Sequence, residues 1–298
     1  MHISRAGRRP PPGRIAYVDG RYIRHGAAGV HVEDRGLQFA DSVYEVIAVS
    51  NARLVDAAPH ILRLEKSLSS IGMAMPVCPA SLAVILNETA RRNQLREGLL
   101  YLQITRGAAP RAHAAPDDTS PTVIVTAKRM DASLMETRRA AGVAVMTTAD
   151  IRWGRCDIKS TGLLPNVLAK TEARKQGADE AWFVDGDGFV TEGSSTNAWI
   201  VGGDGEPITR SLRDNILAGI TRGVLLQALS DAGIAARERA FSVEEAYGAR
   251  EAFISSATGG VIPVVKIDGK PVGSGAIGPV AKQMHALYCE LSRKISMV

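Results

Sequence analysis

Cysteine and histidine are scarce in this chain of 298 residues, and neither is spaced as a metal site requires. The three cysteines, Cys78, Cys156 and Cys289, are far apart and form no Cys-x-x-Cys pair, which argues against a zinc site and a disulfide framework. The six histidines show no His-x-x-x-His spacing, so we expect no metal ion. We interpret Cys156 as a small buried side chain rather than a nucleophile.

The chain also lacks a long apolar run. None approaches the roughly 20 residues that a membrane helix needs, and no signal-peptide core is present, so we expect a cytoplasmic protein without a membrane segment. The formal net charge is +5, but four arginines lie within residues 1–14, a segment that holds no acidic residue. The rest of the chain is nearly neutral, and no basic helix indicates a nucleic-acid partner.

Length and composition predict two globular domains behind a short tail. A chain of 298 residues exceeds what one core usually organises, and 45% hydrophobic residues suffice for ample cores. Residues 1–14, rich in arginine and proline, are predicted to form a flexible basic tail. We expect an N-terminal α/β domain at 15–130, a charged linker at 131–142 and a larger, strand-rich C-terminal domain at 143–298.

Turn signals and apolar periodicity predict the main elements. Asp19-Gly20 favours a hairpin between strands at 15–18 and 22–23. Further strands are predicted at 43–49, 99–105, 122–127 and 143–147, followed by strand-turn pairs at 182–190, 197–208 and 264–272. Helices are predicted at 59–71, 81–93, 165–176, 221–229 and 280–295.

Two segments between these elements have a functional interpretation to consider. Residues 107–121 form a long connection rich in Pro, Ala and Asp, and long loops in compact domains are often functional. Residues 273–278 match the Gly-x-Gly-x-x-Gly pattern of dinucleotide-binding proteins. Only twenty residues follow them, too few for the second strand and acidic residue of such a unit. We interpret residues 273–278 as a turn that starts the last helix at Pro279.

The most informative pattern is a lysine followed 33 positions later by a glutamate. Lys159 lies between a predicted strand and a predicted helix, and Glu192 lies in a Gly/Ser-rich turn. A lysine amine can form a Schiff base with the aldehyde of pyridoxal, and a carboxylate can keep the pyridine nitrogen protonated. The turn at 219–221 aims N–H groups and a hydroxyl at an anion such as a phosphate. Taken alone, a lysine is usually a surface charge and such a turn an ordinary helix cap.

Five short motifs follow the order found in D-amino acid aminotransferases and together resemble that family. They are residues 35–45, 105–113, 152–160, 191–197 and 219–222. The resemblance spans roughly residues 15–290. It implies the two-domain α/β (α+β) architecture of the fold type IV group of pyridoxal phosphate enzymes. That group also holds branched-chain aminotransferases and aminodeoxychorismate lyase.

The resemblance implies a role around pyridoxal phosphate for each matched residue. Lys159 is implied as the Schiff-base residue, which also moves a proton between the substrate α-carbon and the cofactor. Glu192 is implied as the partner of the ring nitrogen. Further cofactor contacts are implied for Arg63, Ser195, Ile220, Thr221, Ser256 and Thr258. Ala257 stands where the family often has a second hydroxyl, which leaves one phosphate contact open.

The resemblance also implies how the substrate is selected. Arg111 can grip a carboxylate through two parallel hydrogen bonds, and His113, two positions further along an extended loop, projects to the same side. In the family a matched arginine and histidine, with a tyrosine matching Tyr44, bind the substrate α-carboxylate. The loop residues come from the neighbouring subunit, so a homodimer with an active site shared between subunits is implied.

We therefore predict pyridoxal phosphate-dependent transamination between a D-amino acid and a 2-oxo acid, in two half-reactions. Ala40 and Ser42 replace glycines of the family, and Gly259-Gly260 resembles relatives that accept R-amines, so the substrate range stays open. The alternatives are an R-amine or branched-chain transaminase, or an aminodeoxychorismate-type lyase on the same fold. A third alternative is a non-catalytic protein that binds anions at the turn of residues 219–222.

Overall fold

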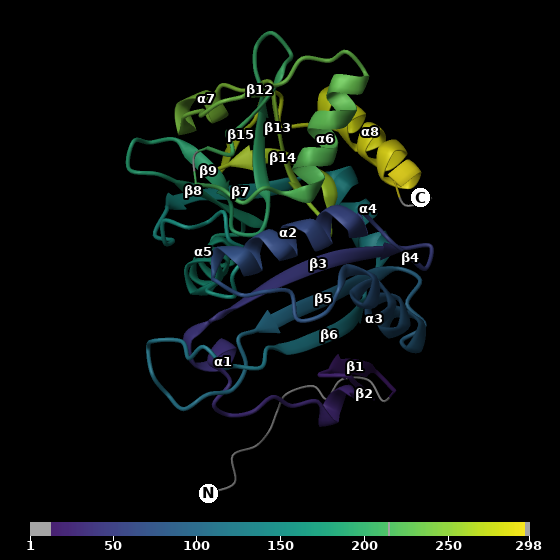
Figure 1. The fold of residues 1–298 in the computed structure, drawn as a ribbon. Coiled ribbons are helices and arrows are strands. Elements are labelled where there is room, and N and C mark those ends of the chain that lie inside the picture. The colour runs from purple at the N-terminus through teal and green to yellow at the C-terminus, as the bar shows by residue number, and fades with distance from the viewer. Residues whose placement is uncertain (1–12, 214, 296–298) are drawn as a thin grey trace, which may run out of the picture. The chain divides into compact units, whose positions relative to one another are not determined.

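The computed structural model describes residues 13–213 and 215–295, and the chain divides into two compact units. The N-terminal unit comprises residues up to 57 and residues 61–130, and the C-terminal unit comprises residues 58–60 and those from 131 onward (Figure 1). Most of the predicted basic tail, residues 1–12, lies outside the described residues. Within the described residues, no helix is both long and apolar enough to cross a bilayer.

The N-terminal unit is built on a six-stranded sheet in which all neighbouring strands are antiparallel. Its strands, in the order β2-β1-β6-β5-β3-β4, are β2 (Arg21–Arg24), β1 (Ile15–Val18), β6 (Thr122–Arg129), β5 (Gly98–Thr105), β3 (Ser42–Ser50) and β4 (Arg53–Leu54). The predicted hairpin is confirmed, because β1 and β2 pair across a turn in which Asp19 and Gly20 both have positive φ, +41° and +81°. The other strands predicted in this unit are also confirmed.

Two helices, α2 (Ala57–Ser70) and α3 (Pro79–Arg92), supply apolar stripes to the core of this part of the chain. Leu64 and Leu68 of α2 are fully buried, as are Leu82 and Leu86 of α3. Each pair is four residues apart and therefore lies on one face of its helix. This periodicity is why both helices were predictable from the sequence.

The short helix α1 (Arg35–Phe39) was not predicted, and it follows a 3₁₀ turn, η1 (His25–Ala27). The Asp34 side chain caps α1 by accepting a hydrogen bond from Gly36 N–H over 2.8 Å. Ala40 ends the helix in the left-handed region, with φ +54°. That conformation suits glycine best, so alanine is accommodated here at a cost of about 1 kcal/mol.

The C-terminal unit is built on a nine-stranded mixed sheet. Its strands are β7 (Val143–Ala149), β8 (Glu180–Val184), β9 (Val190–Gly193), β10 (Asn197–Val201), β11 (Pro207–Thr209), β12 (Arg237–Glu238), β13 (Glu251–Ser256), β14 (Gly260–Ile267) and β15 (Lys270–Pro271). The order is β12-β11-β10-β13-β14-β7-β8-β9, and β15 pairs with β14. The pairs β14–β7, β7–β8 and β11–β12 are parallel.

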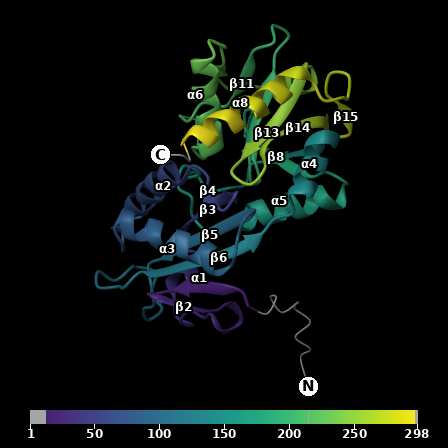
Figure 2. The same ribbon diagram turned by 90° about the vertical axis from the view of Figure 1, so that its right-hand side faces the viewer.

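The helices of this unit are α4 (Ala132–Ala141), α5 (Leu164–Lys175), α6 (Ile220–Asp231), α7 (Val243–Tyr247) and α8 (Pro279–Ile295). All but α4 pack on the sheet through separate apolar clusters. Helices α6 and α8 lie side by side (Figures 1 and 2). Their apolar residues form one buried cluster with the stacked rings of Trp199 and Phe253. Residues 131–142, predicted as a linker, contain α4, which has no buried residue. The run was not recognised as a helix because it carries no apolar stripe.

The Gly-x-Gly-x-x-Gly segment is a turn that leads into α8, as predicted. The Glu251 carboxylate occupies the start of this helix, accepting hydrogen bonds from Val280 N–H over 3.0 Å and Ala281 N–H over 2.9 Å. A Cβ atom at Gly278 would clash with the Glu251 side chain. A protein carboxylate therefore takes the position that a dinucleotide phosphate would need.

Candidate active site

Lys159 lies in the loop that connects β7 to α5 in the C-terminal unit. The side chain is half-buried, and tight backbone contacts shape the chain around it. Ile158 N–H donates to Arg155 O over 3.2 Å, and Ser160 N–H donates to Ile158 O over 2.8 Å. The positive charge of Lys159 favours the ionised form of the Glu192 carboxylate. The two residues, 33 positions apart in the sequence, thus lie close enough for their charges to interact.

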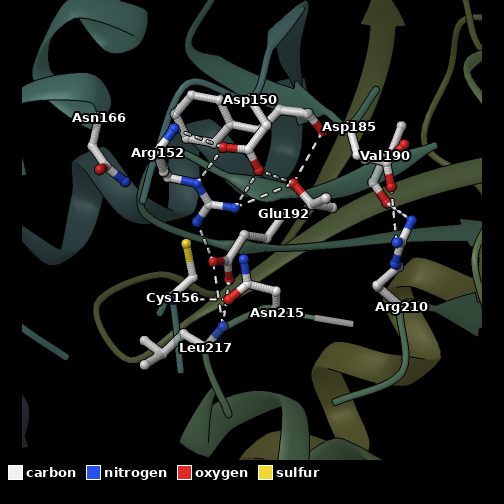
Figure 3. A network of polar contacts seen from close by, with 12 residues as sticks. Asp150, Arg152, Cys156, Asn166, Asp185, Val190, Glu192, Arg210, Asn215 and Leu217 are labelled. Atoms are coloured by element: carbon white, nitrogen blue, oxygen red, sulfur yellow. Dashed lines mark hydrogen bonds and ion pairs between the residues drawn. The ribbon is translucent and has the colours of Figure 1, made fainter. Parts of the chain in front are cut away.

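Glu192 lies on β9, whose four residues are all buried, and donors from three other segments hold its carboxylate. Arg152 donates through Nη1 to Oε1, and Asn197 donates through Nδ2 to Oε2 over 3.2 Å. Leu217 N–H lies 3.3 and 3.2 Å from the two oxygens (Figure 3). Since the donors approach from different segments, they fix the orientation of the carboxylate.

Arg152 joins Glu192 to a second carboxylate, that of Asp150 (Figure 3). Arg152 Nε and Nη2 donate to the two Asp150 oxygens over 2.9 and 2.7 Å, and Nη2 also donates to Thr191 Oγ1 over 3.2 Å. The guanidinium carbon lies 4.5 Å from the centre of the Phe183 ring. Two carboxylates share one guanidinium here, so the guanidinium cannot neutralise both, which suits a site for a cationic ring.

Burial and the Arg152 guanidinium shift the pKa values of the two carboxyl groups, Asp150 and Glu192, in opposite directions. Burial raises the pKa of Glu192 above its ordinary value, and the Arg152 guanidinium opposes the rise. Burial would also raise the pKa of Asp150, but the hydrogen bonds from Arg152 outweigh it and lower that pKa. Burial raises the pKa of the Cys156 thiol to about 11. Cys156 therefore stays protonated at neutral pH, which supports its interpretation as a buried side chain rather than a nucleophile.

A short segment joins the Glu192 carboxylate to the start of α6. Leu217 binds Glu192, and α6 begins three residues later. Gly219 precedes the helix so close to Asn197 that a Cβ atom would clash with the amide oxygen. In the described chain α6 has no side-chain cap, and Thr221 Oγ1 is buried without a hydrogen-bond partner. An unsatisfied hydroxyl beside the N–H groups of a helix start is a donor set that suits a phosphate.

Three further residues predicted to contact the cofactor lie at this end of the sheet. Ile220 is the first residue of α6. Ser256 ends β13 and accepts a hydrogen bond from Gly259 N–H over 3.2 Å, and Thr258 is exposed in the same turn. The residue before Ser256 pairs with Asn197 across β13 and β10. The turn of residues 256–259 therefore lies beside Asn197, the first residue of β10.

Ser195 has a protein partner of its own. Its hydroxyl donates to Glu180 Oε2 over 2.9 Å, and the Ser194 hydroxyl donates to Glu180 Oε1. Glu180 is buried, and Lys170 Nζ lies 2.9 Å from it. Glu180 therefore fixes the turn that directly follows Glu192, and with it the direction in which this turn presents its hydroxyl groups.

Two of the predicted residues in the N-terminal unit make well-defined contacts there. Arg63, on α2, donates through Nε and Nη2 to the two oxygens of the buried Glu45, over 2.8 and 2.7 Å. Tyr44, on β3, stacks on Tyr101 with 5.6 Å between the ring centres. The ion pair keeps the Arg63 side chain in one orientation.

Arg111 and His113 lie exposed in the loop of residues 107–121, which carries no regular secondary structure beyond one isolated bridge. Arg111 Nη1 donates to Gln38 Oε1 over 3.2 Å, and the guanidinium carbon lies 4.7 Å from the centre of the Phe39 ring. The His113 ring lies 5.7 Å from the same ring. Both side chains therefore gather around Phe39, at the end of α1.

Comparison with known proteins identifies the family to which this arrangement belongs. Residues 42–267 match the family described as amino-transferase class IV. The chain belongs to the class IV aminotransferases. The predicted recognition is thereby confirmed at the level of the family, and enzymes of this family use pyridoxal phosphate. The residues of the C-terminal unit fit that cofactor: an amine, a buried carboxylate and an unsatisfied hydroxyl at a helix start.

Relatives of this class IV aminotransferase include two named D-alanine aminotransferase. One, from Bacillus licheniformis, is 42% identical over 90% of this chain and 93% of its own. The other, from Listeria innocua, is 38% identical over 92% and 94%. The solved structure of a T.th. branched-chain amino acid aminotransferase with pyridoxamine 5′-phosphate is 27% identical, with a TM-score of 0.88 and 95% of each chain covered. The predicted α/β (α+β) architecture of fold type IV is confirmed, and the structure builds it on two sheets.

Sequence reasoning missed several residues that shape the site of this aminotransferase. They are Asp150, Arg152, Glu180, Asn197 and Leu217. Arg152 and Asn197 lie inside motifs that carried the resemblance, and the spacing of Asp150 and Arg152 allows one to bind the other in an extended chain. Leu217 acts through its backbone N–H, so its side chain gives no sequence signal.

Proposed function

We propose that this class IV aminotransferase transfers the amino group of a D-amino acid to a 2-oxo acid, releasing the corresponding 2-oxo acid and D-amino acid. The observation that carries the proposal is the buried Glu192 carboxylate, which donors from three segments hold beside the stretch that leads to Thr221. The preference for D-amino acids is supported by the relatives named D-alanine aminotransferase, at 42% and 38% identity.

The cofactor residues divide into two groups that hold its opposite ends. Bound pyridoxal phosphate supplies an aldehyde that takes up the amino group and a protonated ring that accepts the electrons of the substrate α-carbon. Glu192 holds a proton at the ring nitrogen, and Arg152 keeps the carboxylate in place. Thr221 Oγ1 and the N–H groups at the start of α6 bind the phosphate. Ser195, Ile220, Ser256, Thr258 and Arg63 complete the contacts.

Lys159 has two tasks in the proposed reaction. Its amine would bind the cofactor aldehyde covalently, and Nζ would be the base that takes the proton from the substrate α-carbon and the acid that delivers it to the cofactor. The half-buried position allows the side chain to reach the reacting atoms while limiting access of water.

Arg111, His113 and Tyr44 select the substrate in this proposal. Arg111 binds the α-carboxylate through two parallel hydrogen bonds, and His113 and Tyr44 add donors. The exposure of Arg111 and His113 suits a loop that completes the active site of a second copy. We also propose that the protein forms a homodimer with shared active sites and that it is located in the cytoplasm.

A second candidate is a transaminase for branched-chain amino acids or R-amines. It is favoured by the similarity, at 27% identity, to a solved branched-chain amino acid aminotransferase. A lyase that uses the same Lys159 is a third candidate. All three candidate functions use the same cofactor site, so they can be distinguished only by which substrate reacts and which product is released.

The test is to mix the purified holoenzyme separately with D-alanine, L-alanine and an R-amine and to follow the cofactor absorbance. We expect only D-alanine to convert the cofactor to its amino form, with release of one pyruvate per cofactor. Addition of 2-oxoglutarate should then restore the starting spectrum. A response to L-alanine or the amine alone would favour the second candidate. Continued release of pyruvate without an acceptor would favour the lyase.

A further inference from the structure

Arg35 is a buried arginine at the start of α1, and its side chain binds a loop 77 positions away. The residue is 3% exposed. Nη1 donates to Ala112 O over 2.7 Å, and Nη2 donates to His113 O over 3.1 Å. Arg35 thus contacts the backbone on both sides of the bond that joins Ala112 to His113.

These two hydrogen bonds are most of what ties the far part of the loop to the N-terminal unit. Residues 110–121 are all described, and their hydrogen bonds to other segments are the two from Arg35 and one from Arg111 to Gln38. The earlier part of the loop is held differently, through Arg35 N–H to Gly107 O over 2.9 Å and Ala109 N–H to Glu33 O over 3.3 Å. Placement of the backbone at residues 112 and 113 therefore depends mainly on the Arg35 side chain.

Arg35 is itself held in place by a carboxylate. Its Nε donates to Asp41 Oδ2 over 2.8 Å, and Arg106 Nε donates to the same oxygen over 2.7 Å. Arg106 Nη2 donates to Ile71 O over 2.7 Å, away from the loop. All three nitrogens of the Arg35 guanidinium are thus used, one toward Asp41 and two toward the loop.

Phe39 supplies the second part of the arrangement. The guanidinium carbons of Arg35 and Arg111 lie 4.8 and 4.7 Å from the centre of its ring, and the His113 ring lies 5.7 Å away. An aromatic ring attracts cations over its face. The side chain of Phe39 therefore orients Arg111, while Arg35 fixes the backbone from which Arg111 and His113 project.

We propose that Arg35 is a positioning residue for substrate recognition, which holds residues 111–113 so that Arg111 and His113 are preorganised for the substrate α-carboxylate. This inference rests on the proposed function of Arg111 and His113. Arginine is required because its planar group presents three nitrogens in fixed directions, toward Asp41 Oδ2, Ala112 O and His113 O. A lysine ammonium keeps the charge beside Asp41 but does not reproduce the fixed fork.

The first test measures steady-state kinetics of the Arg35→Lys holoenzyme with D-alanine and 2-oxoglutarate. We expect KM for D-alanine to rise about ten-fold, because a displaced carboxylate-binding group weakens binding, while kcat changes less than about two-fold. In an Arg111→Ala background, Arg35→Lys should add little to KM, because the group that it positions is gone. An additive effect of the two substitutions would overturn the positioning role.

The second test measures the loop directly. Trypsin cleaves after Arg111, and cleavage reports how often the loop opens. Mass spectrometry should show cleavage between residues 111 and 112 several-fold faster in Arg35→Lys than in the unmodified protein. The matched control is Arg106→Lys, since Arg106 shares Asp41 but does not bind the loop carbonyls. Equal cleavage in Arg35→Lys and Arg106→Lys would contradict the proposal.

The two tests separate this inference from the proposed function. If the unmodified enzyme does not turn over D-alanine, the proposed function fails, and the rate of cleavage alone decides whether Arg35 holds the loop. If D-alanine is turned over and Arg35→Lys leaves both KM and cleavage unchanged, the proposed function stands and the role of Arg35 is refuted. Faster cleavage with unchanged KM would likewise refute a role in substrate recognition.

Discussion

The two units hold their functional charges in different ways. In the C-terminal unit, Glu192 is buried and receives donors from three segments, one of them an arginine that also binds Asp150. In the N-terminal unit, Arg111 and His113 are exposed, and their backbone is held by the single side chain of Arg35. One arrangement is a network buried in a sheet, and the other is an exposed loop whose far part is held mainly by one side chain.

This difference agrees with the roles proposed for the two sets of residues. A carboxylate that controls the protonation of a ring needs a fixed geometry and a low dielectric, which a buried network supplies. A group that selects substrates needs access to solvent, and loops on a rigid scaffold provide it. The buried network has its own cost, because removing one partner leaves an uncompensated charge. Substitutions in the C-terminal unit should therefore affect chemistry and stability, and those in the loop should affect KM.

Lys159→Ala is expected to have the largest effect of all. Without the amine, the enzyme loses both the covalent attachment and the group that moves the proton, so turnover of D-alanine should fall by about a thousand-fold or more. Borohydride reduction followed by mass spectrometry should label Lys159 in the unmodified holoenzyme. Lys175→Ala, at an exposed position on α5, serves as the control and should retain activity. Appreciable turnover in Lys159→Ala would refute the assigned role.

Arg152→Met is expected to have the second-largest effect. It tests whether the buried carboxylates of Asp150 and Glu192 both depend on the Arg152 guanidinium. The substitution leaves Glu192 and Asp150 buried without their shared partner, so the free energy of unfolding should fall by about 3–5 kcal/mol. Urea unfolding of the apoprotein measures this loss, and kcat should fall with it, since Glu192 is no longer fixed.

The matched control for this substitution is Arg155→Met. Arg155 lies three residues along the same loop and pairs with Asp157, but its side chain is 52% exposed. An exposed ion pair contributes at most about 1 kcal/mol. Equal losses of stability in the two variants would show that the buried network of Asp150, Arg152 and Glu192 contributes no more to the free energy of unfolding than an exposed ion pair.

The comparison also shows which features a sequence reveals. Helices with apolar periodicity and the strands of the N-terminal unit were predicted nearly to their ends, because burial of one face imposes the pattern. In the C-terminal unit, β13 was not predicted and β14 begins four residues before its predicted start. Helix α4 was predicted as a linker because it has no buried residue, and α1 was missed because five residues are too short to show a period. Local capping by Asp34, rather than an apolar face, defines α1.

The site was predictable to a different extent. Lys159, Glu192 and the turn before α6 follow from motifs whose residue types carry the chemistry. The partners that orient them do not, because Arg152 and Glu192 are 40 positions apart and Arg35 binds backbone carbonyls 77 and 78 positions away. Such pairs exist only once the sheets have formed. The sequence therefore indicates the candidate reacting groups, and the structure adds the groups that hold them.

Thr221→Val is expected to have an intermediate effect and separates binding of the cofactor from stability of the fold. Thr221 Oγ1 is buried without a partner, so its loss should leave the apoprotein at least as stable as before. A hydrogen bond to a charged phosphate contributes about 1.5–3 kcal/mol, so the dissociation constant of pyridoxal phosphate should rise about ten- to a hundred-fold. Thr221→Ser keeps the hydroxyl and should bind normally. Unchanged affinity in Thr221→Val would remove this residue from the phosphate site.

The smallest expected effect is in the pH dependence of stability, where the contributions of Asp41 and Glu192 should differ in sign. Burial would raise the pKa of Asp41, but hydrogen bonds from Arg106 and Arg35 overcome it and lower that pKa below its ordinary 3.8. Burial raises the pKa of Glu192 above 4.5. A carboxyl group whose pKa is lowered by folding stabilises the fold at pH values above 3.8. This contribution is lost as the pH falls through the pKa of the folded state. A carboxyl group whose pKa is raised by folding stabilises the fold at pH values below 4.5. This contribution is lost as the pH rises through the pKa of the folded state.

Apoprotein unfolding in urea, followed over a range of pH, measures both contributions against variants that cannot ionise. Relative to Asp41→Asn, the unmodified protein should lose stability as the pH falls below 3.8. Relative to Glu192→Gln, it should lose stability as the pH rises above 4.5. Bound pyridoxal phosphate should weaken the second trend, because a cationic ring beside Glu192 favours the ionised carboxylate. Trends of the same sign in both variants would mean that Glu192 is not held as a buried carboxylate awaiting a cation.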